Sequence, residues 1–412
     1  MKIQDIHARE IFNSRGIPTV ECDLLLNDGT IFTASVPSGI SRSAYEAVEL
    51  RDGGERLNGL GVQKAIAVIE NIIAPIFIDR SPDLILFDTE MIELDQTINK
   101  SYLGANAILA VSMVLCRAQA YSENMELYEF IAQLCEYSSI DFPSPMFNIF
   151  GGGLHNDTQF PIQEILLVPT KKSSFHQAME TGIEIFYVLK DMLQKQGKST
   201  AIGLEGGFIA DFTDAYQAFD MVTEAILRTK NDDMKIGLDI AASCFYHDAM
   251  QSYTLFGQKM SSQELIEWYC KLADTYPLHS IEDGLAQSDY DGWSGLTKAL
   301  SGKVCIIGDD LFATDYNRIM QGIKSNAATA AIIKPNQVGT ITETLQSVVL
   351  CKEHTIDVIV SHRSGETNDS FITDLAIGIS AQYIKAGGFN RGERMAKYNR
   401  LLNIEQDLSL FL

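Results

Sequence analysis

Six short apolar runs in the second half of the chain each end in a residue that could bind a ligand or move a proton. The runs end at Asp239, Glu282, Asp309, Lys334, His362 and Lys385. The spacing between these residues is about the length of one strand plus one helix, repeated. Side chains at the C-terminal ends of successive parallel strands meet at one mouth of a (β/α) barrel. We therefore expect three carboxylates, two lysines and a histidine to converge there.

The three carboxylates Asp239, Glu282 and Asp309 carry the oxygen ligands that Mg²⁺ prefers. Without a cation, three carboxylates in contact would repel one another, and at least one would have to stay protonated. Each carboxylate on its own could instead be the N-cap of the helix that follows its strand. Their common position in the barrel repeat favours a metal site over three separate caps.

Two lysines and one polar turn could act on an anionic substrate. Lys334 and Lys385 could each serve as a base if the pKa is lowered, as an anion clamp if the charge is kept, or as a structural ion pair. The turn after the fifth run places His362, Arg363 and Ser364 together. Such a set of donors suits an oxyanion such as phosphate, although an ordinary strand-to-helix loop with a serine cap has the same composition.

Two glycine-rich segments each hold one further candidate. Gly203–Gly207 places Glu205 between glycines and matches neither a P-loop nor a dinucleotide-binding fingerprint. The segment that starts at Gly151 presents His155 on a loop that we expect to be flexible. Either segment alone would be a weak signal.

The length and patterning of the chain predict two domains. The chain has 412 residues, and a barrel takes about 250 of them. Residues 1–35 alternate as strands do, with a hairpin turn at Asn27-Asp28-Gly29, and residues 61–133 have helical periodicity. We predict a small α+β domain over residues 1–135, a linker over 136–145 and a barrel over 146–412, which makes an α/β protein with an N-terminal α+β domain.

The composition limits the partners and the compartment. A formal net charge of −22 argues against non-specific binding to nucleic acid or to anionic membranes. The sequence has no apolar run long enough to span a membrane, and its N-terminus lacks the apolar core of a signal peptide. Seven cysteines without a CxxC pair favour a reduced, cytoplasmic protein with buried thiols.

Many segments along nearly the whole chain resemble the enolase family. They are Asn13–Val20, Pro37–Gly39, Glu49–Asp52, Asn99–Ser101, Leu103–Ala107, Gln163-Glu164, Ser280–Asp283, Gly308–Leu311, Asn336–Thr340, Ser361–Thr367 and Lys397–Asn399. The resemblance implies a barrel of the enolase kind, with an unusual start, below an α+β domain. It also implies a lyase of glycolysis and gluconeogenesis, which interconverts 2-phosphoglycerate and phosphoenolpyruvate through an enolate.

The resemblance also implies a role for each candidate residue. Lys334 would remove the C2 proton, and Glu205, supported by Glu164 and Gln163, would donate a proton to the leaving hydroxide. The substrate would be held by Lys385 at its carboxylate and by the turn of His362, Arg363 and Ser364 at its phosphate, while His155 would close over it. Asp239, Glu282 and Asp309 would bind one Mg²⁺, and Ser41 a second. A homodimer or a larger homo-oligomer is implied as well.

Two alternatives to a working enolase remain open at this stage. The first is a paralogue that acts on a related phosphonate or 2-oxy-acid anion, and Arg42 in the loop after Pro37 favours it. The second is a non-catalytic binding or interaction protein on the same fold. The presence of Lys334, Glu205 and the metal carboxylates argues against the second, because a non-catalytic copy has no chemical need for them. Leu204, beside Glu205, is a further departure from the family pattern.

Overall fold

Alternating apolar residues form an antiparallel sheet at the start of the chain. The computed structural model describes residues 1–39, 43–137, 140–153, 158, 160–171, 173–212, 214–231 and 233–410. Strands β1 (Ile3–Phe12), β2 (Pro18–Leu26) and β3 (Ile31–Ser35) pair in that order. The predicted hairpin turn joins β2 to β3. Val20, Cys22 and Leu24 of β2 are fully buried because alternate residues of the strand face the helices.

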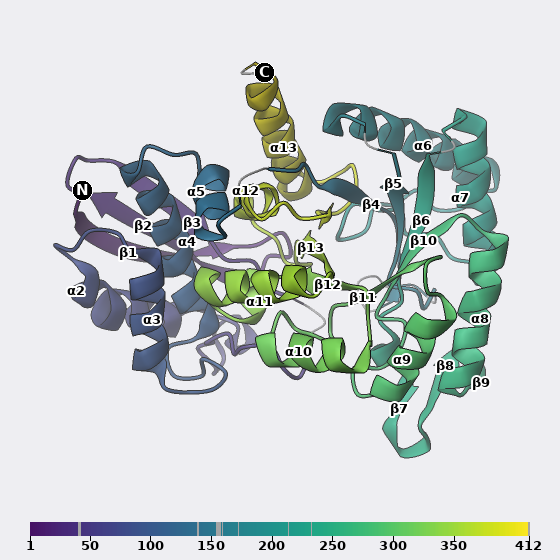
Figure 1. Cartoon of the computed structure of the whole chain (residues 1–412), viewed down its shortest axis with the longest axis horizontal. Helices are drawn as coiled ribbons and strands as arrows, with labels where there is room; N and C mark the ends of the chain where they lie inside the picture. The colour runs from purple at the N-terminus through teal and green to yellow at the C-terminus, as the bar shows by residue number, and fades with distance from the viewer. Residues whose placement is uncertain are drawn as a thin grey trace.

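The helical part of this domain packs on that sheet (Figure 1). Its α-helices are α1 (Gln63–Val68), α2 (Ala74–Phe77), α3 (Leu84–Asp95), α4 (Ala105–Ser122) and α5 (Leu127–Leu134). Helix α4 is the central element, since most of its residues are buried and it contacts both β2 and β3. The α+β character predicted for the first part of the chain is confirmed, while the boundary at 136–145 stays a prediction.

Eight strands close into a barrel. They are β4 (Ser144–Gly151), β5 (Glu164–Pro169), β6 (Met234–Asp239), β10 (Leu278–Glu282), β11 (Cys305–Gly308), β12 (Ala330–Ile333), β13 (Asp357–Ser361) and β14 (Tyr383–Lys385). All six runs singled out in the sequence are strands of this ring or end directly after one. Strand β5 runs antiparallel to both β4 and β6, whereas the other neighbouring strands are parallel.

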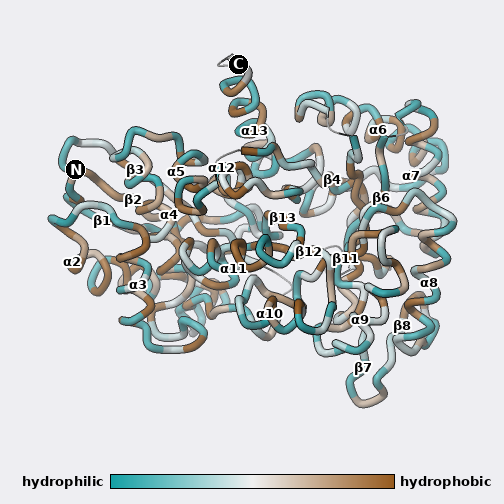
Figure 2. Tube along the Cα trace, viewed as in Figure 1, coloured by the Kyte–Doolittle hydropathy of each residue, from teal (hydrophilic) through white to brown (hydrophobic). Residues whose placement is uncertain are grey.

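Helices surround the ring. They are α6 (Phe175–Lys195), α7 (Ala215–Thr229), α8 (Ser262–Thr275), α9 (Tyr290–Ala299), α10 (Tyr316–Ser325), α11 (Ile341–Glu353), α12 (Phe371–Gly378) and α13 (Gly392–Leu410). In Figure 2, helices α6 to α8 alternate hydrophobic and hydrophilic stretches, as helices with one buried face do. A short antiparallel sheet of β7 (Tyr246–His247), β8 (Ser252–Leu255) and β9 (Gln258–Met260) precedes α8. No helix in the described ranges is both long and apolar enough to cross a membrane.

The helix caps rule out one interpretation of the candidate carboxylates. Helices α9 and α10 are capped by Asp289 and Asp315, and α11 by Thr340. Asp239, Glu282 and Asp309 cap no helix among the described residues. The serines of the turn after β13 are not caps either, because the N-cap of α12 is Ser370. These side chains are therefore available for a site at the barrel mouth.

Buried polar contacts join the N-terminal domain to the barrel. The guanidinium of Arg117 on α4 binds Asp369 at 2.7 Å, and Lys100 binds Glu343 at 2.8 Å. Ser38, after β3, exchanges two backbone hydrogen bonds with Gly365 at 2.8 and 2.9 Å. The loop after β3 is thereby attached to the turn that follows β13, at the barrel mouth where the candidate residues converge.

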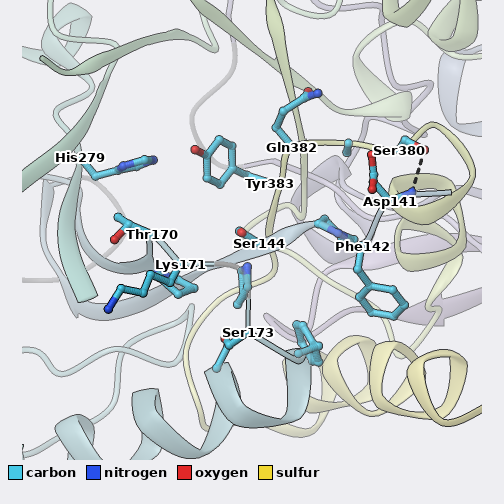
Figure 3. A pocket seen from close by; sticks show the side chains of 16 residues that line it. Asp141, Phe142, Ser144, Thr170, Lys171, Ser173, His279, Ser380, Gln382 and Tyr383 are labelled. Atoms are coloured by element: carbon cyan, nitrogen blue, oxygen red, sulfur yellow. Dashed lines mark hydrogen bonds between the residues drawn. The ribbon is translucent and has the colours of Figure 1, made fainter. Parts of the chain in front are cut away.

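A cavity of about 470 Å³ lies at the opposite mouth of the barrel (Figure 3). Its wall includes His279 and Tyr383, near the starts of β10 and β14, and Thr170, just beyond the end of β5. Because β5 is reversed, its C-terminal end lies at this mouth. None of the candidate catalytic or metal residues lines this cavity, so it is separate from the site built from the strand ends.

His279 should make stability depend on pH. Burial lowers the pKa of His279 from 6.5 to about 4, so the folded chain binds this proton more weakly than the unfolded chain does. The contribution of neutral His279 to the free energy of unfolding is complete above pH 6.5 and is lost as the pH falls toward 4. We expect this to destabilise the protein by about 2 kcal/mol between pH 7 and pH 5.

Urea unfolding of wild type and of His279→Gln at several pH values measures this effect. The glutamine variant should have a shallower pH dependence between pH 7 and 5, because it cannot take up the proton. Equal slopes in the two proteins would contradict the assignment.

Candidate active site

Eleven residues line a pocket at the C-terminal mouth of the barrel. They are Gln163, Glu164, Glu205, Asp239, Asp309, Lys334, Ser361, His362, Arg363, Ser364 and Lys385. Glu282 borders the same space, because its carboxylate contacts Lys385. The convergence predicted from the strand spacing is therefore confirmed by the geometry. Ser41 and His155 lie outside the described residues, and their positions stay predictions.

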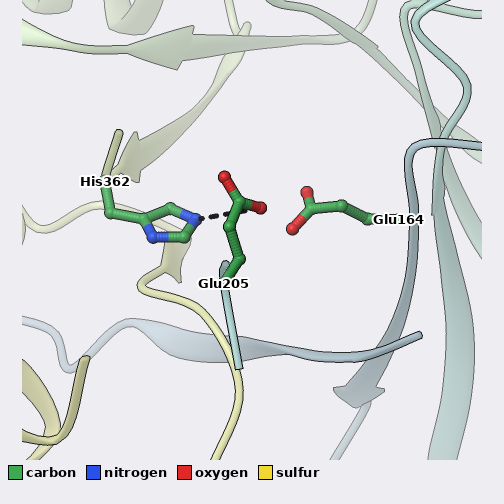
Figure 4. Close-up of side chains that lie close together, drawn as sticks. All are labelled: Glu164, Glu205 and His362. Carbon is green, nitrogen blue, oxygen red and sulfur yellow. Dashed lines mark ion pairs between the residues drawn. The ribbon is translucent and has the colours of Figure 1, made fainter. Parts of the chain in front are cut away.

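Glu164, Glu205 and His362 form one group in this pocket (Figure 4). One ligand atom from each lies within 4.8 Å of the other two, and His362 Nε2 is 4.0 Å from Glu205 Oε2. Burial raises the pKa of Glu164, and the adjacent Glu205 raises it further. Two buried carboxyl groups this close favour sharing one proton. The pair can therefore donate a proton at neutral pH.

The predicted metal carboxylates lie at the same mouth but are separated by the two lysines. Lys385 Nζ is 2.9 Å from Asp239 and 2.8 Å from Glu282, while Lys334 binds Asp309. Within the described ranges, two sets of three potential ligand residues have atoms within 4.8 Å of one another. They are Glu164–Glu205–His362 and Asp283–Asp309–Asp310. Asp239, Glu282 and Asp309 therefore lie at the same mouth, but they are not one of these compact sets.

The residues nevertheless suit a divalent cation. Oε1 of Glu282 is buried and has no hydrogen-bond partner among the described residues. Burial, with Asp239 close by, raises the pKa of Glu282 to about 8. A bound Mg²⁺ would give this oxygen a partner, and it would neutralise the negative charge of the neighbouring carboxylates. The all-oxygen set fits Mg²⁺ better than a thiophilic metal.

The two lysines are charged in this arrangement. Burial opposes the charge on Lys334, but Asp309 outweighs burial and raises the pKa of Lys334. Burial likewise opposes the charge on Lys385, but Asp239, Glu164 and Glu282 raise its pKa well above the usual value. Lys385 can therefore act as an anion clamp as it stands. Lys334 can act as a base only when Asp309 is engaged elsewhere, since a base must be neutral.

The turn after β13 presents a buried arginine to a partner from the N-terminal domain. Arg363 donates to Glu46 at 3.0 and 3.1 Å and to Asn336 at 3.0 Å. Burial acts to lower the pKa of Arg363, but Glu46 outweighs burial and raises this pKa. The guanidinium of Arg363 therefore stays charged. A Cβ atom at position 39 would lie 1.8 Å from Arg363 Nη2, so a residue larger than Gly39 would have to displace the guanidinium. The loop of the first domain thus fits closely against Arg363.

Three positioning residues were not found from the sequence. Asp283 accepts hydrogen bonds from the backbone N–H groups of Asp309 and Asp310 at 3.0 and 2.8 Å, and so orients the start of that loop. Asn148 on β4 donates to Glu164. Arg394 on α13 donates to the carbonyl oxygen of Arg363, in the turn after β13, and to that of Leu204, beside Glu205. Asn148 could have been found as an amide in an apolar strand, but nothing in the spacing indicates Arg394.

The comparisons with known proteins agree with this geometry. The family model "Enolase, N-terminal domain" matches residues 3–131, and "Enolase, C-terminal TIM barrel domain" matches residues 139–410. The chain is 45% identical to the protein named "Enolase" of Acidothermus cellulolyticus, over 98% of this chain and 94% of the relative. It is 44% identical to "Enolase 2" of Lactococcus lactis subsp. lactis, over 98% and 96%. The chain therefore belongs to the enolase family.

Proposed function

We propose that the chain catalyses the reversible dehydration of 2-phosphoglycerate to phosphoenolpyruvate at this mouth of the barrel. The observation that carries the proposal is the convergence of Lys334, Glu205 and Arg363 in one pocket of a member of the enolase family. In this proposal Lys334 takes a proton, Glu205 gives a proton and Arg363 holds the phosphate. The full-length identity favours this reaction over the paralogue and the non-catalytic alternatives.

Lys334 is proposed as the base that removes the C2 proton. It follows β12 and projects into the pocket. If Asp309 held a metal ion instead of pairing with Lys334, Lys334 would lose the group that keeps its pKa high. A neutral amine can then take the proton. The expectation from the sequence that Lys334 is the base thus depends on Asp309 having another partner.

Glu205 is proposed as the acid that protonates the leaving hydroxyl at C3. Its carboxyl group lies beside that of Glu164, which is buried and has a raised pKa. Sharing one proton between the two groups keeps a carboxylic acid available at neutral pH. Gln163 supports this side of the pocket by donating to Asp239 at 3.1 Å. In the reverse direction, the deprotonated pair takes a proton from water.

The remaining contacts are proposed to bind the two anionic ends of the substrate. Lys385 is proposed to hold the carboxylate, because its ammonium lines the pocket and contacts Asp239 and Glu282 there. Arg363, Ser364 and His362 share the turn after β13 and are proposed to hold the phosphate. Because Glu46 lies on the fork of Arg363, it competes with a phosphate for that fork. His155 is proposed to complete the enclosure.

Mg²⁺ is the proposed cofactor, at two sites. Asp239, Glu282 and Asp309 are proposed to hold the first ion, and Ser41, together with the substrate, the second. When bound, Mg²⁺ would stabilise the negative charge that develops on the substrate carboxylate as the C2 proton leaves. The unpartnered oxygen of Glu282 and the acidic surroundings support this assignment. We also propose that the protein acts in the cytoplasm as a homodimer or a larger homo-oligomer.

Glu205→Gln tests the division of labour between base and acid. Glutamine keeps the shape of the side chain but cannot donate a carboxylic proton. We expect net dehydration to fall by roughly 10²- to 10⁴-fold, as for loss of a general acid. Exchange of the C2 hydrogen with D₂O should persist, because Lys334 is untouched.

Proton NMR of 2-phosphoglycerate in D₂O, beside absorbance at 240 nm for product, separates the two steps. Exposed Glu267→Gln on α8 is the matched control. Loss of both exchange and dehydration in Glu205→Gln would contradict the assigned roles. The absence of any reaction in the wild-type protein with excess Mg²⁺ would overturn the proposed function itself.

A further inference from the structure

Arg394 on helix α13 is a fully buried arginine that reaches the catalytic turns. Its Nη1 lies 2.7 Å from His362 Nδ1 and 2.7 Å from the carbonyl oxygen of Arg363. Its Nη2 lies 2.9 Å from the carbonyl oxygen of Ser364 and 3.2 Å from that of Leu204. One guanidinium therefore joins the turn that carries the phosphate ligands to the segment that carries Glu205.

These contacts determine where His362 carries its hydrogen. A guanidinium can only donate hydrogen bonds. The Nδ1 atom that faces Arg394 must therefore be the acceptor nitrogen, without a hydrogen. A neutral imidazole then carries its hydrogen on Nε2, and an imidazolium is excluded because its Nδ1–H would face a donor. Burial, together with Arg394, lowers the pKa of His362 well below its usual value, which agrees with a neutral ring.

The hydrogen on Nε2 faces the proposed acid. In Figure 4 the Nε2 side of the ring points to Glu205, which lies between His362 and Glu164. The 4.0 Å between Nε2 and Glu205 Oε2 is longer than a hydrogen bond, so the N–H faces Glu205 without bonding to it in this structure. The ring cannot offer a lone pair to Glu205 while Arg394 occupies the other nitrogen.

We infer that Arg394 is a positioning residue for the acid step: it fixes His362 as the neutral Nε2–H tautomer and holds that N–H toward Glu205. This inference rests on the role of Glu205 proposed above. When Glu205 gives its proton to the leaving hydroxyl, the carboxylate that forms faces a fixed N–H dipole. The His362 hydrogen stays on Nε2 throughout, so one proton moves, from Glu205 to the departing oxygen.

The tautomer can be measured without turnover. The chain has seven histidines, and ¹⁵N-histidine NMR of the intact protein separates protonated from unprotonated ring nitrogens. The His362 signals are those missing in His362→Gln. We expect wild-type His362 to have an unprotonated Nδ1 and a protonated Nε2 from pH 6 to 8. An Nδ1–H tautomer or an imidazolium in the wild-type protein would overturn the inference, whatever the enzyme's activity.

Arg394→Met removes the donors, and Arg400→Met on the same helix is the control. Arg400 pairs with Asp374 at 2.6 Å, away from the pocket. In Arg394→Met we expect His362 to lose the single tautomer, kcat to fall roughly 10- to 100-fold, and KM to change less. The pH profile of kcat should shift, and C2 exchange should persist. Arg400→Met should keep the tautomer and the profile.

A purely structural role for Arg394 predicts a different result. In that case both arginine variants would be less stable than wild type. The folded fraction of Arg394→Met would keep the wild-type His362 tautomer and pH profile, and this result would contradict the inference. If Arg394→Met does not fold, the wild-type tautomer still decides. Failure of the proposed function would appear separately, as a wild-type protein with the expected tautomer but no dehydration of 2-phosphoglycerate.

Discussion

Lys334→Ala is expected to lower kcat for dehydration of 2-phosphoglycerate by roughly 10³-fold or more, near the upper range for loss of a general base. Lys334 pairs with Asp309, whereas Lys385 pairs with Glu164, Asp239 and Glu282. Its removal also leaves Asp309 without a buried cation to balance its charge. Absorbance at 240 nm with excess Mg²⁺ follows the formation of phosphoenolpyruvate.

The Lys334→Ala experiment needs an isotope readout and a lysine control. Exchange of the C2 hydrogen with D₂O should be lost together with dehydration, in contrast to Glu205→Gln, which should keep it. Exposed Lys324 on α10 provides the control, because Lys324→Ala removes an equal charge far from the pocket. Near wild-type C2 exchange in folded Lys334→Ala would show that another group is the base.

Glu282→Gln is expected to weaken Mg²⁺ binding by roughly 100-fold or more, since it removes a proposed direct ligand rather than a supporting contact. The amide cannot carry the negative charge, and Oε1 of Glu282 is a buried oxygen without a hydrogen-bond partner among the described residues. Calorimetric titration with Mg²⁺ measures the affinity directly. Dehydration should then require correspondingly more Mg²⁺, and a chelator should abolish it in the wild-type protein.

A second acidic group makes this metal prediction discriminating. Asp283, Asp309 and Asp310 also bring ligand atoms within 4.8 Å of one another. Asp283, however, already accepts two backbone hydrogen bonds, which assigns it a structural role. We therefore expect Asp310→Asn to bind Mg²⁺ about as well as wild type. Loss of binding in Asp310→Asn with retention in Glu282→Gln would place the ion in the other group.

The strand spacing predicted much of the site because a parallel barrel translates spacing into position. Asp239, Glu282 and Lys385 each end a strand, so their convergence followed from the repeat. Glu164 could not be found this way, because it begins β5 and β5 is reversed. Only the resemblance to enolase indicated it. The same reversal explains why β5 gave no strand-end candidate, whereas β4 ends at this mouth in Gly151, which has no side chain to offer.

The charge state of the site could not be read from spacing. Whether Lys334 is neutral depends on its pairing with Asp309, and whether Arg363 is free depends on Glu46. These partners lie 25 and 317 residues apart in the chain. The role of Arg394 is equally remote from its targets, since it combines a helix near the C-terminus with the backbone of Leu204. Such contacts arise from tertiary packing, which residue order alone does not specify.

The reversed strand β5 also affects how this mouth can change over time. Gly151, at the end of β4, pairs with Glu164, so the connection between β4 and β5 is a direct hairpin at the catalytic mouth. Strands β10 to β14 leave this mouth toward a helix, and β6 reaches α8 through the short sheet of β7 to β9. An insertion after one of those strands risks displacing a helix, whereas the hairpin can gain or lose residues without moving one. We expect length variation among descendants of this fold to collect at the hairpin, where it would alter access to Glu164 while leaving the ring intact.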